Sequence, residues 1–341
     1  MKAMALDAYD GPPTWRDVPD PTIGPRDVLV KVKAAGLCAS DLKIVDGLVP
    51  SVSLPYVPGH EVAGEVAEIG AEVTGLAPGD HVTLYMTVGC GLCDPCRVGR
   101  ENLCLSAPRI GFEMDGGFAE YVRAPARNAV KIDSSVPLIQ AAVLPDAVAT
   151  CHHALTWKAK VRAGETVVVV GVGGLGIHAV QLANLMGARV IAADVEPEKL
   201  SAAEGFGAEP IDVRVEALPA QVNALTHGAG ADVVVECVGG SAVTGVLGDA
   251  VKCLKLNGRL MVVGYAYGAP LTVETSDLIY GQWNIMGTRA STLQDVVDVV
   301  RLVESGRLTP VVSETVAMEG LSEALETLRR NPPVGRIVLT T

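Results

Sequence analysis

The chain has 341 residues, of which 49% are apolar and 19% charged, so it is long enough for two domains with well-filled cores. Its 27 basic and 39 acidic residues give a net charge of −12, and only 4% of the residues are aromatic. A negative protein repels phosphate backbones and anionic lipid surfaces, and few aromatic rings are available for base stacking. We therefore expect neither nucleic-acid nor membrane binding.

The first residues do not have the features of a signal peptide. MKAMALDAYDGPPTW contains one lysine, an early aspartate and no apolar core. No stretch approaches the roughly 20 apolar residues that a membrane span needs. We expect a cytoplasmic protein, in which cysteine thiols stay reduced.

The first 150 residues are rich in glycine and proline and contain short β-branched runs. These runs are DVLVKVKAAG, EVAGEVAEIG and GDHVTLYM. Short strands separated by glycine turns predict an antiparallel or barrel-like β domain.

Two motifs in this part contain metal-binding residue types. In GLCASDLK, Cys38 follows a strand-like run, and in PGHEVAGEV, His60 and Glu61 open another. Cysteine, histidine and a carboxylate around zinc leave a fourth position for water or substrate, as in catalytic zinc sites. Taken singly, Cys38 can also be a small buried thiol, and His60 with Glu61 can be a surface pair or a hydrogen-bonded pair.

Four of the eight cysteines lie within fifteen positions, in CGLCDPCRVGRENLC. Their spacing suits one zinc ion held by four thiolates, with glycines and Pro95 making the turns. Disulfides would need an oxidising compartment, whereas an iron–sulfur cluster remains an alternative. Four thiolates fill a zinc tetrahedron, so this site is predicted to be structural. The cysteines are Cys90, Cys93, Cys96 and Cys104.

After Leu144 the pattern changes to apolar strands alternating with helix-length segments. ETVVVVGVGGLGIHAVQLANLMG predicts a strand, a glycine turn and a helix, and further strands are predicted at ARVIAAD, ADVVVECVG and GRLMVVG. Such alternation indicates a parallel sheet covered on both faces. The tail contains a helix-like LQDVVDVVRLVESG and a strand-like GRIVLTT. The pattern alone leaves open which domain the tail joins.

The glycine turn has the dinucleotide-binding pattern GVGGLG. Its glycines permit a tight turn, a close approach of backbone to pyrophosphate, and close packing of helix against strand. Asp194 ends the next strand, where a carboxylate accepts hydrogen bonds from the ribose of NAD and repels the 2′-phosphate of NADP. Asp194 could instead be a solvated residue that caps a helix. We favour the ribose-binding role, and therefore NAD over NADP as the coenzyme. The residues of the turn are Gly171, Gly173, Gly174, Leu175 and Gly176.

Together with DGGFAEYV, these motifs resemble, in order and over essentially the whole chain, the zinc-dependent medium-chain alcohol dehydrogenases. The resemblance implies an α/β protein with two domains. A GroES-like β-barrel catalytic domain would comprise residues 1–148 and 284–341, with the four-cysteine lobe at 87–105. A doubly wound Rossmann NAD-binding domain would comprise residues 149–283. The resemblance also implies that the four-cysteine lobe binds zinc rather than an iron–sulfur cluster.

The resemblance implies a catalytic zinc held by Cys38, His60 and Asp146. Many relatives have cysteine where this chain has Asp146, and Cys151, five positions out of register, is the alternative ligand. Glu61 would lie behind the metal as a transient ligand, and Asp41 would orient the imidazole of His60.

Further roles follow from the resemblance. Ser40 would contact the substrate oxygen and begin a proton relay, and Lys43 stands where a histidine often continues it. Thr150 and Gly264 would lie at the nicotinamide and Lys199 at the adenosine ribose. Arg336 would bind the pyrophosphate, or else be a solvated surface arginine.

The expected function is reversible, zinc-dependent oxidation of an alcohol to an aldehyde or ketone with NAD. Apolar residues at 49–54, 112–114 and 265–267 favour a secondary or bulky alcohol. We expect two zinc ions per subunit, a small-molecule substrate, and a homodimer or homotetramer. Alternatives are a polyol or amino-alcohol dehydrogenase, a zinc-free quinone reductase, and a zinc- and NAD-binding protein without turnover.

Overall fold

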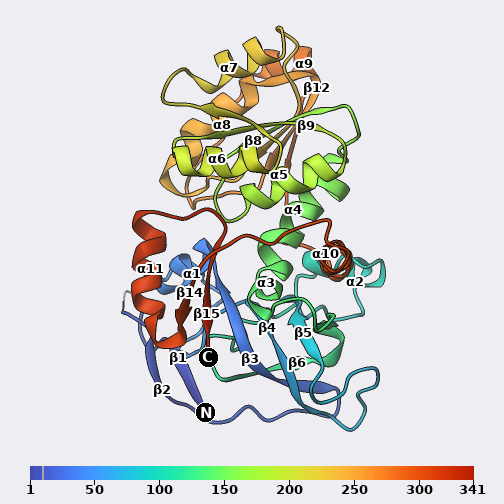
Figure 1. Ribbon diagram of the computed structural model, residues 1–341, viewed down its shortest axis with the longest axis vertical. Helices are drawn as coiled ribbons and strands as arrows, with labels where there is room; N and C mark the ends of the chain where they lie inside the picture. Colours follow the sequence, from blue (N-terminus) through green and yellow to red (C-terminus); the bar gives the residue numbers. More distant parts are fainter. Residues whose placement is uncertain (10) are drawn as a thin grey trace. The chain divides into compact units, whose positions relative to one another are not determined.

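The computed structural model describes residues 1–9 and 11–341. The chain divides into two compact units (Figure 1). The outer unit comprises Met1–Ala149 and Ala290–Thr341, and the inserted unit comprises Thr150–Arg289. Within the described ranges, no helix combines the length and apolar character of a membrane span.

The inserted unit is built on a six-stranded sheet whose strands are all parallel. Its order, β10-β9-β8-β11-β12-β13, places the first strand of the unit beside the fourth, which is the order of dinucleotide-binding folds. The strands are β8 (Thr166–Val170), β9 (Arg189–Asp194), β10 (Glu209–Asp212), β11 (Ala231–Glu236), β12 (Leu254–Val262) and β13 (Asn284–Gly287).

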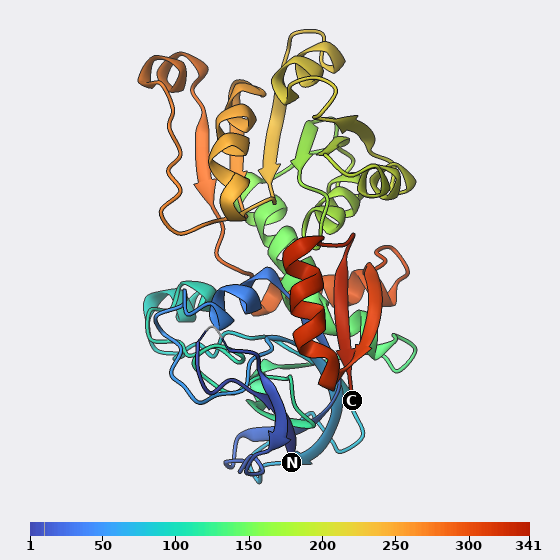
Figure 2. The same cartoon turned by 90° about the vertical axis from the view of Figure 1, so that its left-hand side faces the viewer.

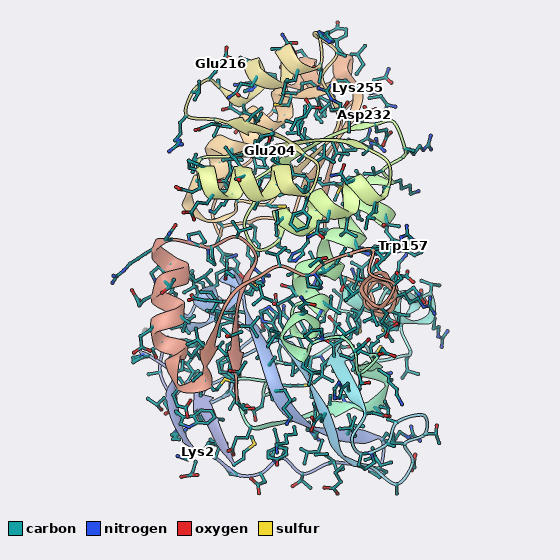
Figure 3. All side chains as sticks on the ribbon, viewed as in Figure 1. Lys2, Trp157, Glu204, Glu216, Asp232 and Lys255 are labelled. Atoms are coloured by element: carbon teal, nitrogen blue, oxygen red, sulfur yellow. The ribbon has the colours of Figure 1, made fainter. Side chains whose placement is uncertain are left out.

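Helices precede the first of these strands and connect the others, and their apolar faces pack on the buried Val/Ile/Ala strands. They are α4 (Ala149–His153), η4 (Ala154–Ala159), α5 (Gly176–Leu185), α6 (Pro197–Gly205), α7 (Leu218–Leu225), η5 (Gly240–Ala242), α8 (Val243–Lys252) and α9 (Thr275–Gly281). Asp232 ties two strand starts together, because it accepts a hydrogen bond from the backbone of Thr166 and pairs with Lys255 (Figure 3).

The predicted domain boundary at residue 284 is wrong in one respect. β13 pairs with β12 in the parallel sheet, so residues 284–287 belong to the inserted unit and not to the tail. The polypeptide leaves this unit at Ala290, whose φ of 46° lies in the left-handed region.

The outer unit is built on a mixed seven-stranded sheet in which β15 lies between β14 and β3. The strands of the whole outer unit are β1 (Lys2–Ala5), β2 (Thr14–Asp17), β3 (Asp27–Leu37), β4 (Glu61–Ile69), β5 (His81–Leu84), β6 (Tyr121–Pro125), β7 (Ala129–Lys131), β14 (Val312–Ala317) and β15 (Arg336–Thr340). β1 and β2 form a separate hairpin-like pair. The tail therefore returns to the first part of the chain through the antiparallel pairing of β15 with β3.

Helices of the outer unit cover this sheet, and α11 lies beside β14 and β15 in both views (Figures 1 and 2). Most β3 and β4 side chains that point inward are apolar and buried in one core. The helices are α1 (Ala39–Val45), α2 (Asp94–Arg97), η1 (Glu101–Leu103), η2 (Ala126–Asn128), α3 (Leu138–Ala142), η3 (Leu144–Val148), α10 (Leu293–Glu304), η6 (Met318–Gly320) and α11 (Leu321–Arg330).

Candidate metal centres and dinucleotide site

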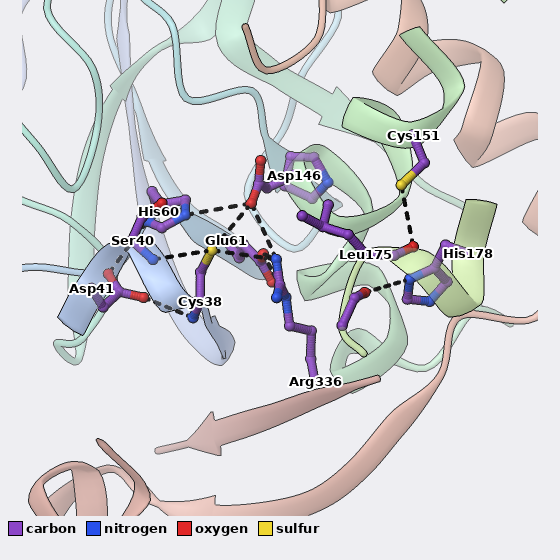
Figure 4. Close-up of polar contacts among 12 residues, drawn as sticks. Cys38, Ser40, Asp41, His60, Glu61, Asp146, Cys151, Leu175, His178 and Arg336 are labelled. Atoms are coloured by element: carbon purple, nitrogen blue, oxygen red, sulfur yellow. Dashed lines mark hydrogen bonds and ion pairs between the residues drawn. The ribbon is translucent and has the colours of Figure 1, made fainter. Parts of the chain in front are cut away.

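Four potential metal ligands from three separate stretches meet inside the outer unit (Figure 4). One ligand atom from each lies within 4.8 Å of the others: Cys38 at the start of α1, His60 and Glu61 at the start of β4, and Asp146 in η3. The Asp146 Oδ2 lies 3.5 Å from Cys38 Sγ and 3.6 Å from His60 Nε2. These spacings suit ligands at 2.0–2.3 Å from one central zinc ion.

The chemistry of this group also suits a cation. Among the described residues, Glu61 Oε2 is buried and has no hydrogen-bond partner. Burial raises the pKa of Glu61 to about 8, although Arg336 and His60 act against the rise. A buried acidic group of this kind is stabilised when a positive charge is placed beside it.

Asp41 holds two members of the group in place. It accepts a hydrogen bond from the backbone of Cys38 at 2.8 Å, completing a capping box at the start of α1. Its other oxygen lies 3.3 Å from His60 Nδ1, which leaves Nε2 directed toward Asp146. Burial disfavours a proton on His60, but the carboxylates of Asp41 and Asp146 outweigh it and raise its pKa. This geometry agrees with an orienting role for Asp41.

Asp146 reaches the group because the helix widens at that point. Leu144–Val148 form a π turn, in which Pro145 contributes no N–H. Such turns are rare in proteins and frequently mark functional sites. Cys151, the alternative ligand, lies in α4, where its thiol contacts the carbonyl of Leu175 at 3.2 Å. The described ligand groups therefore contain Asp146 and not Cys151.

Arg336 occupies a different environment from the predicted one. It is 5% exposed at the start of β15, and its guanidinium lies 2.8 Å from Glu61 and 3.2 Å from Asp146. Burial acts against its charge, but Cys38, Glu61 and Asp146 outweigh it and raise its pKa. Arg336 was predicted either to bind the pyrophosphate or to be a solvated surface residue. Both predictions are wrong for this structure, because Arg336 is buried and contacts the candidate metal ligands.

Ser40 and Lys43 lie on α1 next to the group. The backbone N–H of Ser40 points to Cys38 Sγ at 3.5 Å. Burial lowers the pKa of Lys43, while Cys38 and Asp146 partly oppose this. A lowered pKa makes the neutral amine more accessible, as a proton relay requires.

The four lobe cysteines form the second candidate metal centre. Their thiols lie within 4.8 Å of one another, and all eight cysteines of the chain are free. Backbone N–H groups of Leu92 and Cys93 lower the pKa of Cys90. The lobe has little core, since Leu92, Val98 and Leu105 are exposed. The arrangement matches a closed structural site that holds the loop together.

The glycine turn of the inserted unit connects β8 to α5. Gly171 has a φ of 86°, and a side chain at Gly176 would collide with the carbonyl of Gly171. The Asp194 carboxylate accepts a hydrogen bond from the backbone of Val172 at 2.7 Å. Asp194 therefore lies against the turn, at the carboxyl end of β9. Gly173, Gly174 and Leu175 complete the turn before α5.

The remaining predicted coenzyme residues are in the same unit. Lys199 is on α6, close behind Asp194 in the chain, and Thr150 is buried in α4. The backbone of Gly264 donates to the carbonyl of Glu236 at 3.1 Å, and a side chain there would meet Glu236 Oε1 at 2.9 Å.

Sequence reasoning missed two features around these sites. Glu236 is a fully buried carboxyl at the end of β11 that accepts from the backbones of Val238 and Gly239. Gly36 lies opposite Glu61 in the sheet, and a side chain there would overlap Glu61 Oε2. The sequence ADVVVEC shows a glutamate at the end of an otherwise apolar strand, and this pattern could have indicated the buried carboxyl of Glu236.

Comparison with known proteins gives consistent matches over both units. Residues 24–134 match the family described as "Alcohol dehydrogenase GroES-like domain", and residues 174–305 match "Zinc-binding dehydrogenase". The NAD-dependent alcohol dehydrogenase of Sulfurisphaera tokodaii is 33% identical, with 99% of each chain covered. The acryloyl-coenzyme A reductase of Metallosphaera sedula is 32% identical over the full length of both chains.

Solved structures agree with these relatives. The alcohol dehydrogenase from Aeropyrum pernix superposes with a TM-score of 0.93 at 34% identity, and each chain is covered completely. This chain belongs to the zinc-binding alcohol dehydrogenase family of medium-chain dehydrogenases, with a GroES-like domain and a Rossmann-like coenzyme domain.

Proposed function

We propose that this protein is an oxidoreductase that interconverts an alcohol and an aldehyde or ketone, using zinc in the outer unit and NAD in the inserted unit. The observation that carries the proposal is the convergence of Cys38, His60 and Asp146 around one ion-sized position. The acid at the end of β9, in contact with the glycine turn, supports NAD as the coenzyme.

The catalytic chemistry would be divided between the bound groups and the chain. Zinc, when bound, supplies a Lewis acid that lowers the pKa of a hydroxyl and polarises a carbonyl, and NAD supplies the hydride acceptor. Cys38, His60 and Asp146 would hold the metal, and Asp41 would keep His60 Nε2 directed toward it.

Protons would leave along α1. Ser40 Oγ would accept the hydrogen bond of the substrate hydroxyl, and the Lys43 amine, whose pKa is lowered by burial, would take the proton onward. Glu61 and Arg336 would balance charge behind the metal, since their side chains pair at 2.8 Å.

Apolar walls support a secondary or bulky substrate. Val49, Val52 and Phe112 are nearly buried, and the ring of Phe112 lies 5.0 Å from that of His60. A polyol or amino-alcohol would need more hydroxyl-binding groups on these walls.

A second substrate class has a specific observation in its favour. Relatives named acryloyl-coenzyme A reductase match this chain at 28–32% identity, close to the alcohol dehydrogenases. Reduction of an activated double bond is therefore the competing reaction on the same framework.

The test is metal analysis combined with a substrate panel. We expect two zinc ions per subunit, NADH formation with secondary alcohols, and loss of that activity after chelation. Alcohols, ketones, polyols and an acryloyl thioester should be assayed in parallel with NAD and NADP. Zinc-loaded protein that binds NADH but turns over none of these would favour the non-catalytic alternative.

A further inference from the structure

The π turn that carries Asp146 is attached to a segment almost 150 residues away. The hydroxyl of Ser291 donates a hydrogen bond to the carbonyl of Pro145 at 3.2 Å. Ser291 is fully buried, and Pro145 directly precedes Asp146. A π turn is a rare backbone conformation that is frequent at functional sites. This contact fixes the carbonyl next to the candidate ligand.

Ser291 is itself held from both sides. Tyr85, which is almost completely buried, donates its hydroxyl to the carbonyl of Ser291 at 2.9 Å. Asn128 in turn donates to the carbonyl of Tyr85 at 2.8 Å. On the other side, Thr292 caps α10 through a capping box with Asp295. The Ser291 hydroxyl is therefore aimed at Pro145 by a fixed backbone.

We infer that Ser291 is a positioning residue for Asp146, acting through the carbonyl of Pro145. By holding the π turn, it keeps Asp146 Oδ2 within 3.6 Å of both Cys38 Sγ and His60 Nε2. The inference rests on the proposed metal site. Groups that orient a metal ligand typically change metal affinity by about 10–100-fold when they are removed.

The test uses cobalt(II) as the probe, because its visible absorption depends on the number of thiolate ligands and on their geometry. Metal-free protein is titrated with cobalt chloride against a competing chelator. The site with one thiolate, Cys38, and the four-thiolate lobe give separate bands. For Ser291→Ala we expect roughly ten-fold weaker cobalt binding at the one-thiolate site with shifted bands, and an unchanged four-thiolate spectrum.

Thr226→Val is the matched control. Thr226 is a nearly buried hydroxyl that donates to the carbonyl of Val222 at 2.7 Å in the inserted unit. Thr226→Val loses this donated hydrogen bond and the acceptor of the Gly230 N–H at 3.0 Å, both away from the two metal centres. It should therefore lower the melting temperature at least as much as Ser291→Ala and leave both cobalt spectra unchanged.

Tyr85→Phe gives a second, milder perturbation should Ser291→Ala fail to fold. It removes the hydroxyl that donates to the Ser291 carbonyl and that also hydrogen-bonds to Thr87, and we expect a smaller shift of the one-thiolate bands in the same direction. If either folded variant binds cobalt with wild-type affinity and spectrum, the positioning role is wrong. If the wild-type protein gives no one-thiolate spectrum, the proposed metal site fails with it.

Discussion

At the scale of residues, the candidate metal centre depends on Asp146, a carboxylate that lies beside Cys38 and His60. Asp146 is a harder ligand than cysteine, and it shares the site with a second carboxylate and a buried guanidinium. Position 146 could be predicted because its distance from the glycine turn follows the family pattern. The Arg336 contacts could not, since a lone arginine near the end of the chain gives no indication of which strand its segment joins.

Asp146→Ala should lose the metal of this centre and nearly all activity. A catalytic zinc site needs three permanent protein ligands, and only Cys38 and His60 would remain, with Glu61 as a transient ligand. The lobe metal and the fold should be kept. Metal content per subunit and circular dichroism check this, with Asp115→Ala as a control acid in the same unit that only accepts a backbone N–H. Full metal content with normal turnover would contradict the ligand role.

Asp194→Ala should shift the coenzyme preference toward NADP, because the carboxylate that repels a 2′-phosphate is gone. It should also weaken both coenzymes, since the backbone of Val172 loses its acceptor. Asp194→Asn separates the two effects, because it keeps an acceptor and removes the charge. Ratios of kcat/KM for NAD and NADP are the measurement; unchanged ratios in both variants would argue against the ribose role.

Glu236→Gln should remove a pH-dependent loss of stability. Burial raises the pKa of Glu236 above its ordinary value, despite the hydrogen bonds from Gly239 and Val238. The folded protein therefore binds the proton of the Glu236 carboxyl more tightly than the unfolded chain does. The stability that this proton contributes is fully present below the pKa of the unfolded state, and it is lost as the pH rises through the pKa of the folded state.

Glutamine stays neutral and can still accept from Val238 and Gly239. Variant and wild type should therefore unfold alike near pH 4.5, and the variant should be the more stable at pH 8. Urea unfolding across this range tests the sign. A variant that becomes relatively less stable as the pH rises would show that Glu236 is ionised without penalty.

At the scale of elements, periodic runs predicted their structures well. The valine-rich run before the glycine turn is β8, and LQDVVDVVRLVESG is the amphipathic α10. Irregular elements were not visible, because a π turn such as Leu144–Val148 uses the same residue types as an ordinary helix. The pairing of β15 with β3 was also hidden, since strand partners far apart in the chain are chosen by tertiary packing.

The four-cysteine lobe should depend on its metal for order. Cys96→Ser would leave three thiolates, and a loop with exposed Leu92 and Leu105 has little apolar burial to replace the lost ligand. We expect a lower melting temperature and faster proteolysis within residues 87–105, with the metal of the other centre retained. Cys253→Ser, a buried thiol outside both centres, is the control. Equal melting temperatures for the wild type and Cys96→Ser would mean that the lobe is dispensable.

At the scale of the whole molecule, the six-stranded sheet of the inserted unit ends in an edge strand on each side, β10 and β13. In α9, which directly precedes β13 in the chain, Ile279 and Tyr280 are 70% and 84% exposed. An exposed edge with apolar neighbours is a ready template for pairing with another chain. The sequence predicted a homodimer or homotetramer but gave no means of choosing between them.

The double variant Ile279→Asp with Tyr280→Asp should weaken self-association, because charge is placed beside that edge. Sedimentation velocity of the wild type should give a dimer or tetramer. The variant should dissociate to monomer at about ten-fold higher protein concentration than the wild type. Leu256→Asp, at a similarly exposed position in the same unit, should behave as wild type. A monomeric wild type would refute the prediction.

The position of β15 has a consequence for how the protein is made. This strand follows every strand of the inserted sheet in the chain, yet it lies inside the outer sheet and begins with Arg336. On a ribosome, all strands of the inserted sheet emerge before it, so that unit can fold during translation while the outer sheet waits until β15 has been made. A chain truncated before Arg336 would therefore carry a well-folded inserted unit and an incomplete outer sheet that lacks the arginine contacting Glu61 and Asp146.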